Sequence, residues 1–336
     1  MTNNKPISIK DIAKLANVSA ATVSRVLNNK GKYSKETEMK IMEIVQRYDY
    51  VSNMAAKSLR ESKSNTIGLI VPDISNSFFS MIALNIEQEL SSYGYSIFIC
   101  NTANDYNKEK AYFRSLNGKL VDGIICISGL QNMSGEINLR NIPIVCIDRF
   151  PNVTDIPVVT SDDYRGSYLA TEHLIKNNCK RIVFITSYTG NYVSTNRTEG
   201  YLEALKHYNI PVDKNLILSY PGKTHSYIES EEVVTEFLES GHTCDGIFAS
   251  NDRAALGALN AVKKFGLKVP ENIQICGFDN SLYSQLPSPS ITTVGRDTKE
   301  LAVKACEILM KMLDGETLPQ MHYQLPVNLI VRESTF

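Results

Sequence analysis

The sequence has 336 residues, of which 43% are hydrophobic and 21% are charged. This is enough for two or three globular units with sizeable cores, and the lack of any apolar run near the roughly 18 to 20 residues that span a bilayer excludes a membrane-spanning protein. The net charge of −1 divides unevenly, because residues 1–62 hold eleven Lys and Arg against six acids, a balance of +5 that leaves −6 for the rest. This asymmetry points to nucleic acid as a partner, although solvated charge alone also produces such differences.

The N-terminal residues do not predict an exported protein, and the cysteine pattern predicts neither disulfides nor a metal site. Residues 1–6 are short and polar and do not resemble an export signal, so a cytoplasmic protein without a membrane partner is expected. The seven cysteines are an odd number, show no Cys-x-x-Cys spacing and lie partly inside apolar runs such as DGIICIS and PIVCID. They indicate buried, reduced thiols. We expect no metal and no cofactor.

Three short helices are predicted in the first 50 residues. Ser8 precedes IKDIAKLA, whose apolar residues recur at helical spacing, and Asn17 suits a left-handed turn before Ser19, which can cap a second helix. A third helix is predicted within residues 34–50. The candidate residues for its apolar side are Met39, Met42, Val45, Ile41 and Tyr48. Two helices joined by a short turn and braced by a third describe a helix-turn-helix unit.

The second of these helices has two contrasting faces. Val23, Val26 and Leu27 form an inward stripe, which leaves the opposite face to small and polar residues. Small side chains allow a close approach of the backbone, and Ser, Thr and Arg can bond phosphates and base edges. The face fits DNA recognition, with an ordinary three-helix structural domain as the alternative.

After residue 65, strand-like apolar runs alternate with helical patterns such as those in residues 79–94 and 252–266. The eleven candidate strands are TIGLIVPDI, YSIFICNT, VDGIICIS, IPIVCID, IPVVTS, RIVFITS, NLILSY, DGIFASND, IQICGFD, SITTVGRD and PVNLIVRES. Such alternation predicts parallel sheets covered by helices on both faces. Eleven strands fit two doubly wound lobes better than one sheet.

Polar residues follow several of these strands. They lie at residues 73–79, 148–149, 251–252 and 279–280, and combine carboxylates, amides, a guanidinium and two phenyl rings. Open parallel sheets bind ligands beyond the carboxyl ends of their strands. Such a set suits a polyhydroxylated ligand. The alternative at any one position is a side chain that only caps the next helix.

The head, a short following segment and several strand ends together resemble the LacI/GalR family of bacterial transcription regulators over essentially the whole chain. The matching segments are SIKDIAKLANVSAATVSRVLN, YVSNMAAKSL, ISNSFF, CIDRF, TNRTEG, SNDRAALG and CGFDN. The chain departs from the usual pattern at Asn17, where many members have Gly, at Ser52 and Ser77, where Pro is common, and at Lys57, where Arg is common.

The resemblance implies an N-terminal all-α helix-turn-helix DNA-binding domain plus an α/β periplasmic-binding-protein-like effector domain with two doubly wound parallel-sheet lobes. The expected domains are the head, residues 1–50, a hinge helix and linker, residues 51–64, and an effector-binding and dimerisation domain, residues 65–336. Within the last, the N-lobe is expected at about 65–162 and 294–323, and the C-lobe at about 163–293 and 324–336.

The resemblance also implies which residues meet DNA. Paired hinge helices enter the minor groove, where Leu59 would wedge between base pairs and the small Ala56 would allow close approach. The candidate DNA contacts are Ser8, Lys10, Ser19, Ala20, Ala21, Thr22, Ser24, Arg25, Asn28, Asn53, Ala56 and Leu59.

The cleft motifs are similar to the pentose-binding branch of the fold. The implied effector contacts are Asn76, Phe78, Phe79, Asp148, Arg149, Arg197, Asn251 and Asp279. Two arginines aimed into one cleft could bond neutral hydroxyls or pair with a phosphate or a carboxylate, so the charge of the effector stays open, with a monosaccharide or simple derivative preferred.

The expected function is repression of a carbohydrate-utilisation operon, with a homodimer bound to a pseudopalindromic double-stranded operator and controlled by a sugar between the lobes. A cytoplasmic sugar-binding protein and a regulator controlled by a protein corepressor are the alternatives. An enzyme is not expected, because PGKT at residues 221–224 lacks the first glycine of a phosphate-binding loop and the five histidines form no catalytic spacing.

Overall fold

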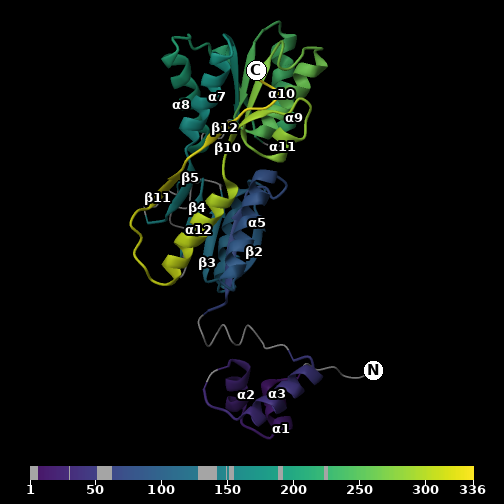
Figure 1. Cartoon of the computed structure of the whole chain (residues 1–336), viewed down its shortest axis with the longest axis vertical. Helices are drawn as coiled ribbons and strands as arrows, with labels where there is room; N and C mark the ends of the chain where they lie inside the picture. The colour runs from purple at the N-terminus through teal and green to yellow at the C-terminus, as the bar shows by residue number, and fades with distance from the viewer. Residues whose placement is uncertain are drawn as a thin grey trace. The chain divides into compact units, whose positions relative to one another are not determined.

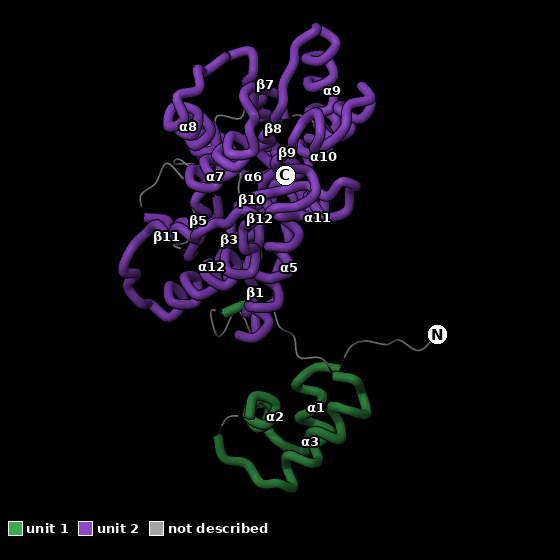
Figure 2. Tube along the Cα trace, turned by 45° about the horizontal axis from the view of Figure 1, so that its top comes forward, with its two compact units in different colours: residues 1–64 green, residues 65–336 purple. Residues whose placement is uncertain are grey.

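The computed structural model describes residues 7–29, 31–50, 63–127, 142–148, 150, 155–187, 192–222 and 226–336. The chain divides into two compact units, Met1–Ser64 and Asn65–Phe336 (Figure 2).

The described residues of the first unit form three helices, α1 (Ile9–Ala16), α2 (Ala20–Leu27) and α3 (Lys35–Arg47). Ser8, Ser19 and Ser34 each cap one helix by accepting a backbone N–H bond, and Asn17 ends α1 in the left-handed region with φ 56°. These caps and turns agree with the sequence prediction. They fold the three helices around one small core.

The core of the first unit corrects the predicted face of α3. Its buried members are Ile12, Ala13, Ala16, Val23, Val26 and Ile41. Ile41 is fully buried, whereas the side chains of Met39 and Met42 are 67% and 48% exposed and Tyr48 is also exposed. The prediction was therefore wrong for these three residues, because Ile41, Ile44 and Val45 lie on the face that meets α1 and α2.

The N-lobe of the second unit is built on a parallel sheet of order β11-β5-β4-β3-β1-β2 (Figure 1). Its strands are β1 (Thr66–Val71), β2 (Ser96–Asn101), β3 (Gly123–Ile127), β4 (Ile144–Ile147), β5 (Val158–Ser161) and β11 (His322–Leu325). Helices α5 (Ser77–Ser92) and α12 (Thr298–Leu313) supply apolar side chains to one core cluster, and α6 (Tyr106–Gly118) supplies them to another. The sheet is thus covered by helices, as its buried apolar strands require.

The C-lobe repeats this arrangement with a sheet of order β12-β10-β9-β8-β6-β7, in which β12 alone runs antiparallel to its neighbour. Its strands are β6 (Ile182–Ser187), β7 (Ile217–Tyr220), β8 (Gly246–Ala249), β9 (Gln274–Asp279), β10 (Thr292–Gly295) and β12 (Asn328–Ile330). Its described helices are α7 (Asp163–Lys176), α8 (Tyr192–His207), α9 (Ser226–Glu239), α10 (Asp252–Lys264), the short α11 (Leu282–Gln285) and a 3-10 turn at Lys214–Leu216. Two doubly wound lobes result.

The chain passes between the lobes after β5, after β10 and after β11. We expected the second and third passages near residues 294 and 324, but these positions lie inside β10 and β11. The passages follow Gly295 and Leu325 instead. Each of the eleven predicted strands overlaps a strand of the structure, whereas β11 was missed because it is short, polar and half exposed at the edge of the sheet.

The close contact of α7 with α8 depends on Gly200. A Cβ atom at this position would overlap the carbonyl oxygen of Tyr164 and would lie 2.8 Å from Cβ of Ser167. The side chain of Ser167 also donates a hydrogen bond to the carbonyl of Arg197. The two helices therefore meet almost backbone to backbone.

We predict that Gly200→Ala lowers the free energy of unfolding by about 1–3 kcal/mol, because the added methyl group forces α7 and α8 apart. Urea unfolding followed by circular dichroism measures the effect. Gly118→Ala is the matched control, since no atom lies within 4 Å of the point that its added Cβ would occupy, and it should leave stability unchanged or raise it by up to about 1 kcal/mol. Equal losses in both variants would contradict the prediction.

Candidate DNA-binding face and effector site

The candidate DNA contacts described by the structure lie on α1 and α2. The exposed members are Ser8, Lys10, Ser19, Ala20, Ala21 and Arg25, and the half-buried members are Thr22, Ser24 and Asn28. Some of their polar atoms already have partners, since the Ser8 hydroxyl donates to Asp11 at 2.6 Å and the Asn28 amide donates to the carbonyl of Ser24 at 2.7 Å. The leading surface of α2 remains small, polar and open to a partner. The hinge candidates Asn53, Ala56 and Leu59 lie outside the described residues.

The N-lobe places three candidate effector residues at the start of α5. Asn76 caps this helix by accepting a bond from the backbone N–H of Phe78 at 3.1 Å. Phe78 is buried, and Phe79 lies edge-on to it with ring centroids 5.6 Å apart. The Asn76 side-chain oxygen thus caps a helix, which is the alternative to ligand binding that the sequence left open at this position.

The carboxyl ends of the two sheets meet at Arg296. Its Nη2 atom donates to Asp148, which follows β4 in the N-lobe. Its Nη1 atom lies 3.4 Å from Oδ1 of Asp279, the last residue of β9 in the C-lobe. Its Nε atom also donates to the Ser161 hydroxyl at 2.9 Å. The flat face of the guanidinium lies 4.3 Å from the ring centroid of Phe78. Arg296 therefore links the lobes through buried ion pairs.

A second buried arginine lies beside the first. Arg197 on α8 donates from Nε to Asp163 at 2.8 Å, its Nη1 atom donates to the carbonyl of Ser250, and its Nη2 atom lies 3.6 Å from Asp279. The guanidinium stacks on Phe278 at 3.6 Å from the ring centroid. Asp279 thus touches both arginines, and the five charged side chains Asp148, Asp163, Asp279, Arg197 and Arg296 form one group, named here the inter-lobe cluster.

Burial sets the charge behaviour of the inter-lobe cluster. It raises the pKa of Asp163 and of Asp279 above the usual carboxyl range, and the two arginines offset this rise only in part. Burial alone would lower the pKa of Arg296, but the three aspartates outweigh it and raise that pKa instead. Carboxylates whose charged form is already disfavoured resist a further negative charge nearby.

Two aspartates of the inter-lobe cluster have unusual backbone angles. Asp148 has φ 54° and Asp279 has φ 110°. These values lie in the region that favours glycine and that residues with a side chain rarely adopt. The backbone therefore turns sharply at both positions and places each carboxylate beyond the end of its strand.

Asn251 occupies a polar corner next to this cluster. Its side-chain oxygen caps α10 by accepting from the backbone N–H of Ala254 at 2.9 Å, and its amide donates to the Tyr220 hydroxyl at 3.0 Å. The last expected effector residue, Arg149, lies outside the described residues.

Asp163 and Arg296 were not predicted as site residues from the sequence. Both lie close to the end of a strand that was predicted, since Asp163 follows the last residue of β5 by two positions and Arg296 follows the last residue of β10 by one. The signal that predicted the other cleft residues, a polar side chain near the end of an apolar strand, is present at both positions. Further contacts join the lobes at the rim, where Arg253 pairs with Asp73 at 3.1 Å and the rings of Phe150 and Tyr192 lie 4.2 Å apart.

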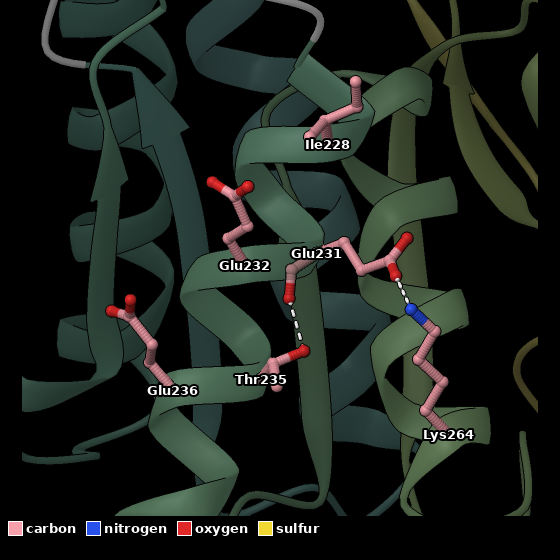
Figure 3. A pocket seen from close by; sticks show the side chains of 6 residues that line it. All are labelled: Ile228, Glu231, Glu232, Thr235, Glu236 and Lys264. Atoms are coloured by element: carbon pink, nitrogen blue, oxygen red, sulfur yellow. Dashed lines mark hydrogen bonds and ion pairs between the residues drawn. The ribbon is translucent and has the colours of Figure 1, made fainter.

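A separate depression lies on the outer side of α9 and α10 (Figure 3). It is lined by Ile228, Glu231, Glu232, Thr235, Glu236 and Lys264. Lys264 pairs with Glu231, so the other carboxylates leave the depression acidic. It is a poor surface for DNA or an anionic ligand. Within the described residues, no group of three or more His, Cys, Asp or Glu side chains is arranged so that it could hold a metal ion, and no helix is long and apolar enough to cross a membrane.

Asp252, the first residue of α10, provides a test of pH dependence. It accepts bonds from the Thr293 hydroxyl at 2.5 Å and the Ser281 backbone N–H at 2.6 Å, and burial raises its pKa from 3.8 to about 7. The folded state therefore binds more protons than the unfolded state between these two values. By linkage, this group's contribution to stability falls as pH rises through that window.

We predict that Asp252→Asn removes this fall, because an amide does not titrate. The free energy of unfolding of the wild type, relative to the variant, should be larger near pH 4.5 than near pH 7.5. Urea unfolding at both pH values measures the difference. A difference that is constant or grows with pH would refute the assignment.

Comparisons with known proteins agree with this architecture. Residues 8–53 match the family "Bacterial regulatory proteins, lacI family", and residues 171–335 match the "Periplasmic binding protein-like domain". The chain is 37% identical over 328 residues to the ribose operon repressor of Halalkalibacterium halodurans, a match that covers 98% of this chain and 97% of the relative. It is 32% identical to catabolite control protein A of Priestia megaterium, covering 98% of this chain and 99% of the relative.

Solved structures show the same fold. A lac repressor dimer bound to operator and the anti-inducer ONPF superposes with a TM-score of 0.88 at 24% identity, covering 98% of this chain and 99% of that chain. A periplasmic binding protein/LacI transcriptional regulator from Alkaliphilus metalliredigens, complexed with D-xylulofuranose, has a TM-score of 0.74 at 33% identity and covers 81% of this chain and 100% of that chain. With the full-length relatives above, these matches show that the chain belongs to the LacI family of bacterial transcriptional regulators.

Proposed function

We propose that the protein represses a carbohydrate-utilisation operon and that a small sugar, bound between the lobes, controls its affinity for the operator. The inter-lobe cluster carries this proposal, because it gathers buried polar groups from both lobes beyond the carboxyl ends of two parallel sheets, where such sheets bind ligands. The relatives support it, since one is named a ribose operon repressor and another structure holds a pentulose.

The DNA-binding part of the proposal rests on the exposed face of α2. Ala20 and Ala21 let the helix backbone approach a duplex, and Arg25 is exposed and long enough to reach a base edge or a phosphate. A regulator that acts on an operator works in the cytoplasm, and the named relatives are regulators, not enzymes.

The homodimer would present two heads to the two halves of a pseudopalindromic operator. The N-lobe exposes apolar side chains that a second copy could cover. They are Met81 and Leu84 on α5 and Phe98 and Ile99 on the edge strand β2, each 44–51% exposed. An edge strand with exposed apolar residues is a surface that proteins usually cover.

Control by a sugar would act through the contacts that join the lobes. A ligand that bonds to Asp148 from the N-lobe and to Asp279 from the C-lobe favours the arrangement of the lobes in which these groups lie close together, and so changes how the lobes sit against each other. Such a change qualifies as allostery only if sugar and operator alter each other's affinity by the same factor.

We predict that Arg25→Ala weakens operator binding about 10- to 100-fold, the effect of about 1–3 kcal/mol for one good base contact. Fluorescence anisotropy at fixed salt measures the affinity for a duplex selected by the wild type from a random pool. Lys40→Ala, which removes an exposed charge from α3, is the control. Equal weakening by both would mean that Arg25 supplies only general charge.

We also predict reciprocal coupling between the two ligands. A sugar that stabilises the protein in a thermal-shift screen of pentoses, hexoses and their derivatives should change operator affinity, and saturating operator should change sugar affinity by the same factor. Titrations with each partner at saturation of the other measure both factors. Operator affinity that stays constant at saturating sugar would eliminate the proposed control, while Arg25→Ala should still bind the sugar.

A further inference from the structure

In the inter-lobe cluster each guanidinium nitrogen has an acceptor, whereas two of the aspartates have one oxygen without a donor among the described residues. Each guanidinium nitrogen of Arg296 has a protein acceptor in Ser161, Asp148 or Asp279. Those of Arg197 are directed at Asp163, Asp279 and the carbonyl of Ser250. Both guanidinium planes are also covered by aromatic rings. The two arginines act as counterions of the aspartates.

The open hydrogen-bonding capacity lies on two carboxylate oxygens. Oδ1 of Asp148 and Oδ2 of Asp163 are buried without a hydrogen-bond partner among the described residues. The side chain of Asp148 is 2% exposed and that of Asp163 is 0% exposed. The other oxygen of each carboxylate pairs with an arginine, Arg296 for Asp148 and Arg197 for Asp163. A buried acceptor without a donor is costly, so a native structure supplies a partner or leaves the position for a ligand.

The charge of the inter-lobe cluster also favours an uncharged hydrogen-bond donor over an anion as its ligand. Among the described residues of the cluster, three aspartates face two arginines, and the aspartates already disfavour each other's charged forms. A phosphate or carboxylate would add negative charge beside two unpartnered acceptors and could displace Asp148 or Asp279 from arginines that need them. A hydroxyl group would donate to either oxygen and leave every ion pair in place.

We propose that the effector is an uncharged sugar, whose hydroxyl groups donate to Asp148 and Asp163, and that the site discriminates against sugar phosphates and sugar acids. Asp163 is then a specificity-determining residue. This inference rests on the proposed function, since it specifies the ligand of the same site.

Two matched sets of ligands test the proposal on the full-length protein by isothermal titration: D-ribose, D-ribose 5-phosphate and D-ribonate, and D-glucose, D-glucose 6-phosphate and D-gluconate. In the set that binds, the uncharged sugar should bind at least about tenfold more tightly than either anion. Asp163→Asn should weaken binding of that sugar about tenfold, because an amide keeps one acceptor for Arg197 and replaces the open one by a donor.

Asp162→Asn is the matched control. It removes the same charge one residue away, and Asn is an equally good cap for α7, where Asp162 accepts from the backbone N–H of Arg165. Sugar affinity should be unchanged in this variant. Asp148→Asn tests the second open oxygen from the other lobe, and far-ultraviolet circular dichroism confirms that each variant is folded.

The outcomes separate this inference from the proposed function. Tighter binding of a phosphate or an acid than of its uncharged parent would overturn the inference and leave a sugar-controlled regulator. Unchanged sugar affinity in folded Asp163→Asn and Asp148→Asn would do the same. No binding in either set, by a protein that still binds its operator, would overturn sugar control itself and the inference with it.

Discussion

The buried guanidinium of Arg296 is the group on which the geometry of the second unit depends. A charge removed from water must be paired, and removing one partner of a buried pair is far more costly than the pair is favourable. Because its two carboxylate partners, Asp148 and Asp279, follow strands of different lobes, the requirement for pairing becomes a requirement on the distance between the sheets. Any ligand that changes this pairing therefore changes the arrangement of the lobes.

The second arginine depends on helix packing instead. Arg197 reaches Asp163 because α8 lies against α7 at the one distance that Gly200 permits, and Ser167 ties the two helices together near the same point. Asp279 then touches both arginines. The carboxylate of Asp279 thus contacts both the arginine held by helix packing in the C-lobe and the arginine that pairs across the lobes. A shift of either arginine therefore changes the contacts of the other.

Local signals predicted much of this molecule. Caps at Ser8 and Ser19 and continuous apolar runs fix helices and buried strands with little help from distant residues. The prediction was wrong where burial depends on a neighbour, as for Met39 and Met42, and it missed β11, which is a strand only because β5 offers its edge. It also missed Asp163 and Arg296, since a polar residue after a strand becomes part of a site only when a second sheet faces it. The assigned roles of individual site residues stay predictions.

The positive φ angles of Asp148 and Asp279 have an evolutionary consequence. A side chain in this region costs about 1–3 kcal/mol of backbone strain, which glycine would relieve. Glycine at either position would relieve this strain, but it would also leave the buried Arg296 without one of its partners, which costs about 3–5 kcal/mol and outweighs the relief. The two aspartates are stabilising only while the arginine is present, so these positions should change together with Arg296 or not at all.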